Sequence, residues 1–185
     1  MSSLQFPDID AAQHWYSTTL DGIRGLRGAI NNQKAPYISD DTLDELFGMS
    51  PHEWQSFLED KIDTHETFST LALMAACEGG IRRDFEWRSR VNSGQEHFVK
   101  FNTLYLSNPT GHLGLWQILD TWRAATNHTG YFKNHLNNLS NLFVARNQLA
   151  HGRASLKSYV FSPTYQELNK VRLKWRDTVS DFRGF

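Results

Sequence analysis

The sequence predicts an all-α protein, a helical bundle with a long antiparallel helical pair. Three observations lead to this fold class. Apolar residues recur at intervals of three and four through most of the 185 residues, which is the period of amphipathic helices. No alternating polar and apolar pattern longer than a few residues indicates a strand. The chain length suits one domain, so residues 1–185 are expected to share one core.

Seven helices are expected from the apolar stripes and the capping signals. The stretch Ser50-Pro51-His52-Glu53 is typical of a helix start, because Ser50 suits the N-cap and Glu53 completes a capping box. The pattern that follows permits a break near Asp60. Ser162-Pro163 is a second cap signal and predicts the start of the last helix. The expected helices cover residues 8–31, 39–47, 51–90, 96–106, 113–125, 131–151 and 162–179.

The composition excludes several classes of protein. No apolar run is long enough to cross a membrane and no apolar leader is present, so we expect a cytoplasmic protein without membrane contact. The single Cys77 rules out an internal disulfide and a cysteine-rich zinc site. Because there is no glycine-rich phosphate loop and no His-Glu-x-x-His motif, neither a cofactor nor a metal is expected.

Charge is spread unevenly along the chain, although the net charge is only −1. Residues 1–70 contain 4 Lys or Arg against 12 Asp or Glu, whereas residues 146–185 contain 8 against 3. A basic C-terminal segment of this kind attracts polyanions such as nucleic acid. Docking of an acidic face of one protomer on a basic face of another explains the same pattern.

The stretch from Leu139 to Gly152 carries the candidate chemistry. At about 100° per residue, Arg146 falls in the middle of an apolar stripe, where a guanidinium needs an anionic partner. Asn147 follows it, and His151 precedes Gly152, a residue that favours the end of a helix. The segment therefore offers a fixed cation, a polar orienting group and a titratable imidazole, which together suit chemistry on a phosphate.

The residues from Arg146 to His151 resemble the signature of the HEPN superfamily, an Arg followed after four to six residues by His, often with a polar residue directly after the Arg. The resemblance implies a small α-helical domain, and many such domains are metal-independent ribonucleases that act as toxins or antiviral effectors. It implies catalytic roles for Arg146, Asn147 and His151, and we expect Arg153 to bind substrate. In HEPN toxins paired with a minimal nucleotidyltransferase antitoxin, a Tyr commonly occupies the position of Arg153, so control by modification of such a Tyr is not supported.

An acidic residue in an earlier helix is a candidate partner of Arg146. Glu78 lies at the centre of a stripe that includes Leu71, Met74 and Ile81, so two stripes are each interrupted by one charge of opposite sign. The pattern predicts an ion pair between Glu78 and Arg146, and HEPN domains often carry such an acidic residue. The alternative is that one helix is rotated and its charge reaches solvent along its own stem.

The segment from Arg82 to Arg90 mixes charged and aromatic residues. Its simpler interpretation is a solvated helix face with i,i+4 pairs such as Arg82–Glu86 and Asp84–Arg88. Arginines interleaved with Trp87 also suit the binding of single-stranded RNA by stacking.

If the motif is catalytic, the expected reaction is RNA cleavage by attack of the 2′-oxygen on phosphorus. Five residues of helix place Arg146 and His151 about 140° apart, so a single copy cannot easily surround one phosphate. A homodimer that presents both copies to a shared cleft resolves this, and HEPN ribonucleases generally form such a composite site. Expected partners are RNA, a second copy and an antitoxin or defence protein. The alternative function is a non-catalytic interaction domain in which Arg146 is a structural ion-pair partner.

Overall fold

The computed structural model describes residues 7–32, 38–46, 48–108, 113–125, 130–151 and 160–185, except the side chain of Tyr131. All regular structure in these ranges is helical, so the predicted all-α class is confirmed. The helices are α1 (Ile9–Asn31), α2 (Asp40–Leu46), α3 (Pro51–Arg90), α4 (Glu96–Leu106), α5 (Leu115–Ala125), α6 (Gly130–Ala150) and α7 (Phe161–Thr178).

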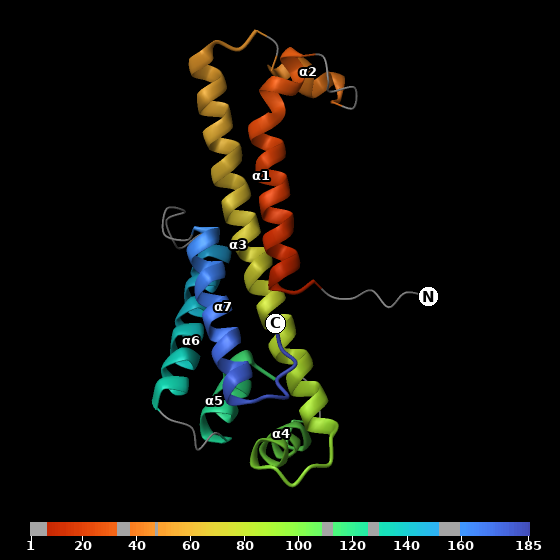
Figure 1. Cartoon of the computed structure of the whole chain (residues 1–185), viewed down its shortest axis with the longest axis vertical. Coiled ribbons are helices and arrows are strands. Elements are labelled where there is room, and N and C mark those ends of the chain that lie inside the picture. The colour runs from red at the N-terminus through yellow and green to blue at the C-terminus, as the bar shows by residue number, and fades with distance from the viewer. Residues whose placement is uncertain (1–6, 33–37, 47, 109–112, 126–129, 152–159) are drawn as a thin grey trace, which may run out of the picture.

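Helix α3 is the axis of the molecule, and its 40 residues span about 60 Å. Helix α1 packs antiparallel along its N-terminal half, which forms the expected long helical pair, and α2 lies beside the far end of that pair (Figure 1). Helices α6 and α7 pack together on the C-terminal half, with α4 and α5 at the lower end (Figure 1). The described part of the chain contains no helix long and apolar enough to cross a membrane.

Contacts along α7 fix the register of the bundle. At the start of α7, the side chain of Glu66 accepts a hydrogen bond from the backbone of Phe161. Beyond the end of α7, the backbone of Phe185 lies so close to Gly80 that a side chain at Gly80 would collide with it. The Phe185 ring in turn contacts Trp175. Helices α3 and α7 therefore run in the same direction. Helix α6 runs the opposite way, because Phe132 near its start contacts Trp175 near the end of α7.

The helix starts confirm one capping prediction and correct another. Ser50 accepts from the Glu53 amide at 3.3 Å and Glu53 accepts from the Ser50 amide at 2.8 Å, so the capping box forms, and α3 continues without a break near Asp60. The prediction that Ser162 caps the last helix was wrong, because α7 begins at Phe161. The Glu66 carboxylate accepts from the Phe161 amide at 2.7 Å, so a side chain from α3 satisfies this helix start.

The core is aromatic at the lower end of the bundle. The Trp175 ring stacks on Phe182 at 4.3 Å and meets Trp122 edge-on at 5.3 Å, so the residues after α7 fold back over the bundle. Both tryptophans are fully buried. The largest fully buried apolar residues here are Trp122, Trp175, Phe101, Phe132 and Phe185.

A charged cluster lies inside this aromatic core, which corrects the expectation of a solvated face over residues 82–90. Arg88 and Asp84 are fully buried and joined by two hydrogen bonds of 2.8 and 3.2 Å. Arg88 also donates to Asp181 at 3.0 Å, and Asp84 accepts from the Arg183 amide at 2.8 Å. The i,i+4 pairing of Asp84 with Arg88 was predicted, but its burial was not, because a charge pattern along one helix does not reveal what covers it.

Replacing Arg88 by Met is expected to lower the free energy of unfolding by about 3–5 kcal/mol, because Asp84 would remain buried without its cation. The control is Arg82→Met, which breaks the partly exposed pair with Glu78 and the 2.9 Å hydrogen bond to the Leu113 carbonyl, and it should cost about 1–2 kcal/mol. Urea denaturation of both variants provides the measurement. Equal losses in the two variants would contradict the role given to the buried pair.

Candidate functional site

Helix α6 places Arg146 at the edge of the core. Leu139, Phe143 and Leu149 are buried on the inner face of the helix, and Arg146 lies in the same stripe with its side chain half-buried. The position predicted from the apolar period is therefore confirmed. The packing of the stripe fixes the stem of Arg146 and limits where its guanidinium can point.

The guanidinium of Arg146 is held by its neighbour in sequence. Nη1 donates to the Asn147 side-chain oxygen at 3.1 Å, whereas Nε is enclosed and has no hydrogen-bond partner. Asn147 itself is exposed. The pair thus presents a cation with unused donor capacity at the surface of α6, and guanidinium donors of this kind match the oxygens of a phosphate or a carboxylate.

The predicted ion pair between Glu78 and Arg146 is not formed. Glu78 instead accepts two hydrogen bonds from Arg82, at 2.9 Å from Nε and 2.7 Å from Nη2. The register of the bundle explains this. Arg146 lies at the level of Glu66 on α3, and Glu78 is about twelve residues further along, roughly 18 Å down the axis.

Glu66, the carboxylate at the level of Arg146, was missed by sequence reasoning and is already occupied. It accepts from the Tyr16 hydroxyl and from the Phe161 amide, which joins α1, α3 and α7. Tyr16 stacks between His65, at 5.1 Å, and Phe161, at 4.0 Å. No signal in the sequence singles out Glu66, because its partners come from two other helices.

His151 lies directly after α6 and is exposed. Its amide donates to the Asn147 carbonyl at 3.1 Å, so the two residues occupy successive turns on one side of the chain. Arg146, Asn147 and His151 therefore share the C-terminal end of α6, and no hydrogen bond joins the side chain of His151 to Arg146 or Asn147 in the described structure. Arg153 lies outside the described residues.

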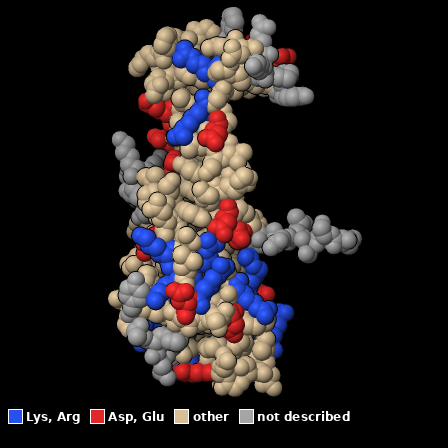
Figure 2. Space-filling view, in the orientation of Figure 1, with Lys and Arg blue, Asp and Glu red and all other residues tan. Residues whose placement is uncertain are grey.

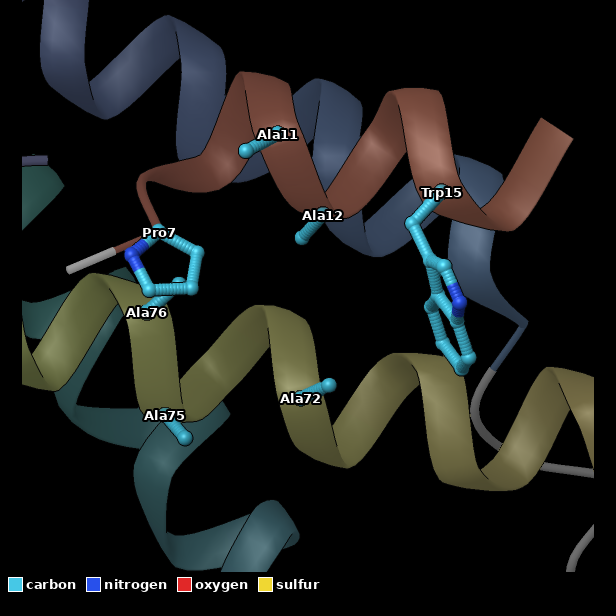
Figure 3. A pocket seen from close by; sticks show the side chains of 7 residues that line it. All are labelled: Pro7, Ala11, Ala12, Trp15, Ala72, Ala75 and Ala76. Atoms are coloured by element: carbon cyan, nitrogen blue, oxygen red, sulfur yellow. The ribbon is translucent and has the colours of Figure 1, made fainter. Parts of the chain in front are cut away.

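Other parts of the described structure offer less chemistry. They contain no group of three or more His, Cys, Asp or Glu side chains placed to hold a metal ion. A groove of about 370 Å³ lies between α1 and α3 (Figure 3). It is lined by Pro7, Ala11, Ala12, Trp15, Ala72, Ala75 and Ala76, none of which can transfer a proton. A second pocket, of about 240 Å³, is lined in part by Arg82, Glu86, Arg90 and Tyr105. The end of α6 remains the candidate site because it carries the predicted motif.

No family model matches the chain, and neither a curated protein nor a solved structure is significantly similar to it.

A double-mutant cycle tests the pairing of Arg146. Combining Glu78→Gln with Arg146→Met should give a coupling energy close to zero, because the two side chains lie at different levels of the bundle. Combining Glu78→Gln with Arg82→Met should give a coupling of about 0.2–1 kcal/mol, typical of a partly exposed ion pair. Urea unfolding of the singles and doubles measures both values. A larger coupling for the first pair would restore the original prediction.

Tyr16 makes stability depend on alkaline pH. Burial and the adjacent Glu66 carboxylate raise the pKa of Tyr16 from 10.0 to about 12. Because the protonated phenol is favoured in the folded state, its contribution is complete below pH 10.0 and is lost as the pH rises toward about 12. The difference in unfolding free energy between wild type and Tyr16→Phe should shrink over this range. A constant difference would contradict the assignment.

Proposed function

We propose that the protein is a metal-independent RNA endonuclease of HEPN type that works as a homodimer. The observation that carries the proposal is the state of Arg146. Its guanidinium is half-buried beside Asn147, and no carboxylate among the described residues binds it. Because a partly desolvated cation is stabilised by an anion, a phosphate of RNA is the ligand that completes this site.

The reaction assigns one role to each residue. The 2′-oxygen of the substrate attacks the adjacent phosphorus and the bond to the 5′-oxygen of the next nucleotide breaks. Arg146 neutralises the charge that builds on the phosphoryl oxygens. His151 transfers a proton at the reacting oxygens, a task that an imidazole performs well near neutral pH. Asn147 orients Arg146 through the 3.1 Å hydrogen bond, and Arg153 contributes a further cation toward the substrate.

The exposed position of His151 supports this assignment. The imidazole lies at the C-terminal end of α6, where solvent and substrate can reach it. Since five residues of an ideal helix place Arg146 and His151 about 140° apart, two copies of the chain supply the Arg and His that face one phosphate in this proposal. The homodimer is therefore part of the proposed mechanism.

In the alternative function, a non-catalytic interaction domain, Arg146 would be a structural ion-pair partner of Glu78 and His151 would cap the end of a helix. Glu78 is bound to Arg82 instead, so the expected ion pair supports neither that function nor the supporting role given to Glu78 in the nuclease. We also propose that this ribonuclease acts as a toxin or antiviral effector that is controlled by a partner protein.

Cleavage of labelled RNA in the presence of EDTA tests the reaction. Wild type should generate 2′,3′-cyclic phosphate and 5′-hydroxyl ends. His151→Ala should reduce the rate by about 10²–10⁴-fold, the usual contribution of a general acid or base, and Arg146→Ala should be similarly impaired. Analysis of the end groups of the products distinguishes this reaction from metal-dependent hydrolysis.

A matched control is His52→Ala, which removes an exposed histidine from the first turn of α3, remote from α6. It should cleave at the wild-type rate. Undiminished cleavage by His151→Ala would assign the activity to another site. A wild-type protein that is dimeric and folded but cleaves no RNA would remove the proposal.

A further inference from the structure

Arg183 forms a second candidate contact surface for RNA, away from α6. Its guanidinium carbon lies 3.7 Å from the centre of the Trp87 ring, yet the residue is exposed. An arginine at this distance from an aromatic face is held by cation–π attraction and stacking. The outer face of the guanidinium is thus presented to solvent in one orientation, so little conformational entropy is lost when a ligand stacks on it.

The buried charged cluster holds this arrangement in place. The Arg183 amide donates to Asp84, and the neighbouring Asp181 accepts from Arg88. The Trp87 ring also meets Phe98 edge-on at 5.4 Å and lies 5.0 Å from the Arg88 guanidinium. Arg183 is therefore held through its backbone amide and Trp87 through its contacts with Phe98 and Arg88, so the outer face of the Arg183 guanidinium is left for a ligand.

The surroundings of the stack are mainly basic, with Glu86, the neighbour of Trp87 in sequence, as an exposed acidic residue. Arg83 and Arg90 flank Trp87 at helical spacings of four and three residues and are exposed on the same face of α3. Figure 2 shows Lys and Arg side chains gathered over the part of the molecule where α7 and the C-terminal half of α3 lie. Asp181, the acidic residue closest in sequence to Arg183, is occupied by Arg88.

The stack and the motif lie toward opposite ends of α7. Arg146 is level with the start of that helix, whereas Arg183 follows its end, and the 18 residues between span about 27 Å. A ligand that contacts both must be an extended chain. Single-stranded RNA meets this requirement, and its unpaired bases stack on guanidinium planes as well as on aromatic rings.

We infer that Arg83, Trp87, Arg90 and Arg183 form a single-stranded RNA-binding surface that is separate from the catalytic motif. A base stacks on the Arg183 guanidinium, and Arg83 and Arg90 contact backbone phosphates. The inference rests on the proposed function for the identity of the ligand, because RNA is its substrate.

Fluorescence anisotropy with labelled single-stranded oligo(U), measured on the full chain in EDTA, tests the surface. The His151→Ala background keeps the probe intact. Arg183→Gln should weaken binding about tenfold or more, the value of one lost base stack, and Arg183→Lys should not restore it, because lysine keeps the charge but not the planar group. Arg90→Gln should lower the slope of log affinity against log salt by about 0.7, the value for one phosphate contact on a single strand.

The matched control is Arg27→Gln. Arg27 is also exposed and lies over a tryptophan ring, 5.4 Å from Trp54, but at the acidic end of the molecule. This variant should bind as the parent does, and thermal unfolding should show that all variants are folded. Equal losses of affinity for Arg27→Gln and Arg183→Gln, or wild-type affinity in Arg183→Lys, would contradict the proposed RNA-binding surface.

The binding assay and the cleavage assay can give opposite results, so the RNA-binding surface and the nuclease activity are tested separately. Wild-type cleavage together with unchanged binding by Arg183→Gln overturns the surface and leaves the nuclease. Binding that depends on Arg183 in a protein that cleaves nothing supports the surface and removes the nuclease. Displacement of the probe by polyglutamate as effectively as by unlabelled oligo(U) overturns the RNA assignment in favour of an acidic protein partner.

Discussion

The buried pair of Asp84 and Arg88 is the interaction on which the lower half of the molecule depends. It connects α3 to the segment after α7 through Asp181 and the Arg183 amide, and it lies against the rings of Trp122 and other aromatic residues. Removing two charges from water is costly, and the cost is offset only while every partner stays in place. The cluster therefore determines how the segment after α7 packs on α3, and hence the position of Arg183.

The helices could be predicted from the sequence because each depends on signals within its own segment. The capping box at Ser50 and the apolar period of α6, which placed Arg146 at the core edge, are local features. The separation of Glu78 from Arg146 and the cap of α7 could not be predicted, since both depend on the axial register between helices distant in sequence. The pair that Glu78 forms with Arg82 is a local i,i+4 contact within α3. A stripe gives the rotation of a helix about its axis but not its position along a neighbour.

The same distinction applies to the candidate site. The sequence brought Arg146, Asn147 and His151 together because a helix fixes residues one to five positions apart. It could not show that no carboxylate of the described residues binds Arg146, nor that Glu66, at the same level of the bundle, bonds to Tyr16 and Phe161 instead. Nor could it show that Asp84 and Arg88 are enclosed, while Arg83 and Arg90, on the same helix, are exposed.

Helix α3 is continuous, but its surroundings differ along its length. Beyond the start of α7, it is covered only by α1 and α2 among the described elements, and Trp54 is the one buried residue between Pro51 and Thr64 (Figure 1). The facing part of α1 contains three glycines, Gly22, Gly25 and Gly28, with open space around each. Amide protons in this part should exchange with solvent through local opening, whereas those near Arg88 require global unfolding. One helix thus joins a stable base to an end that opens on its own.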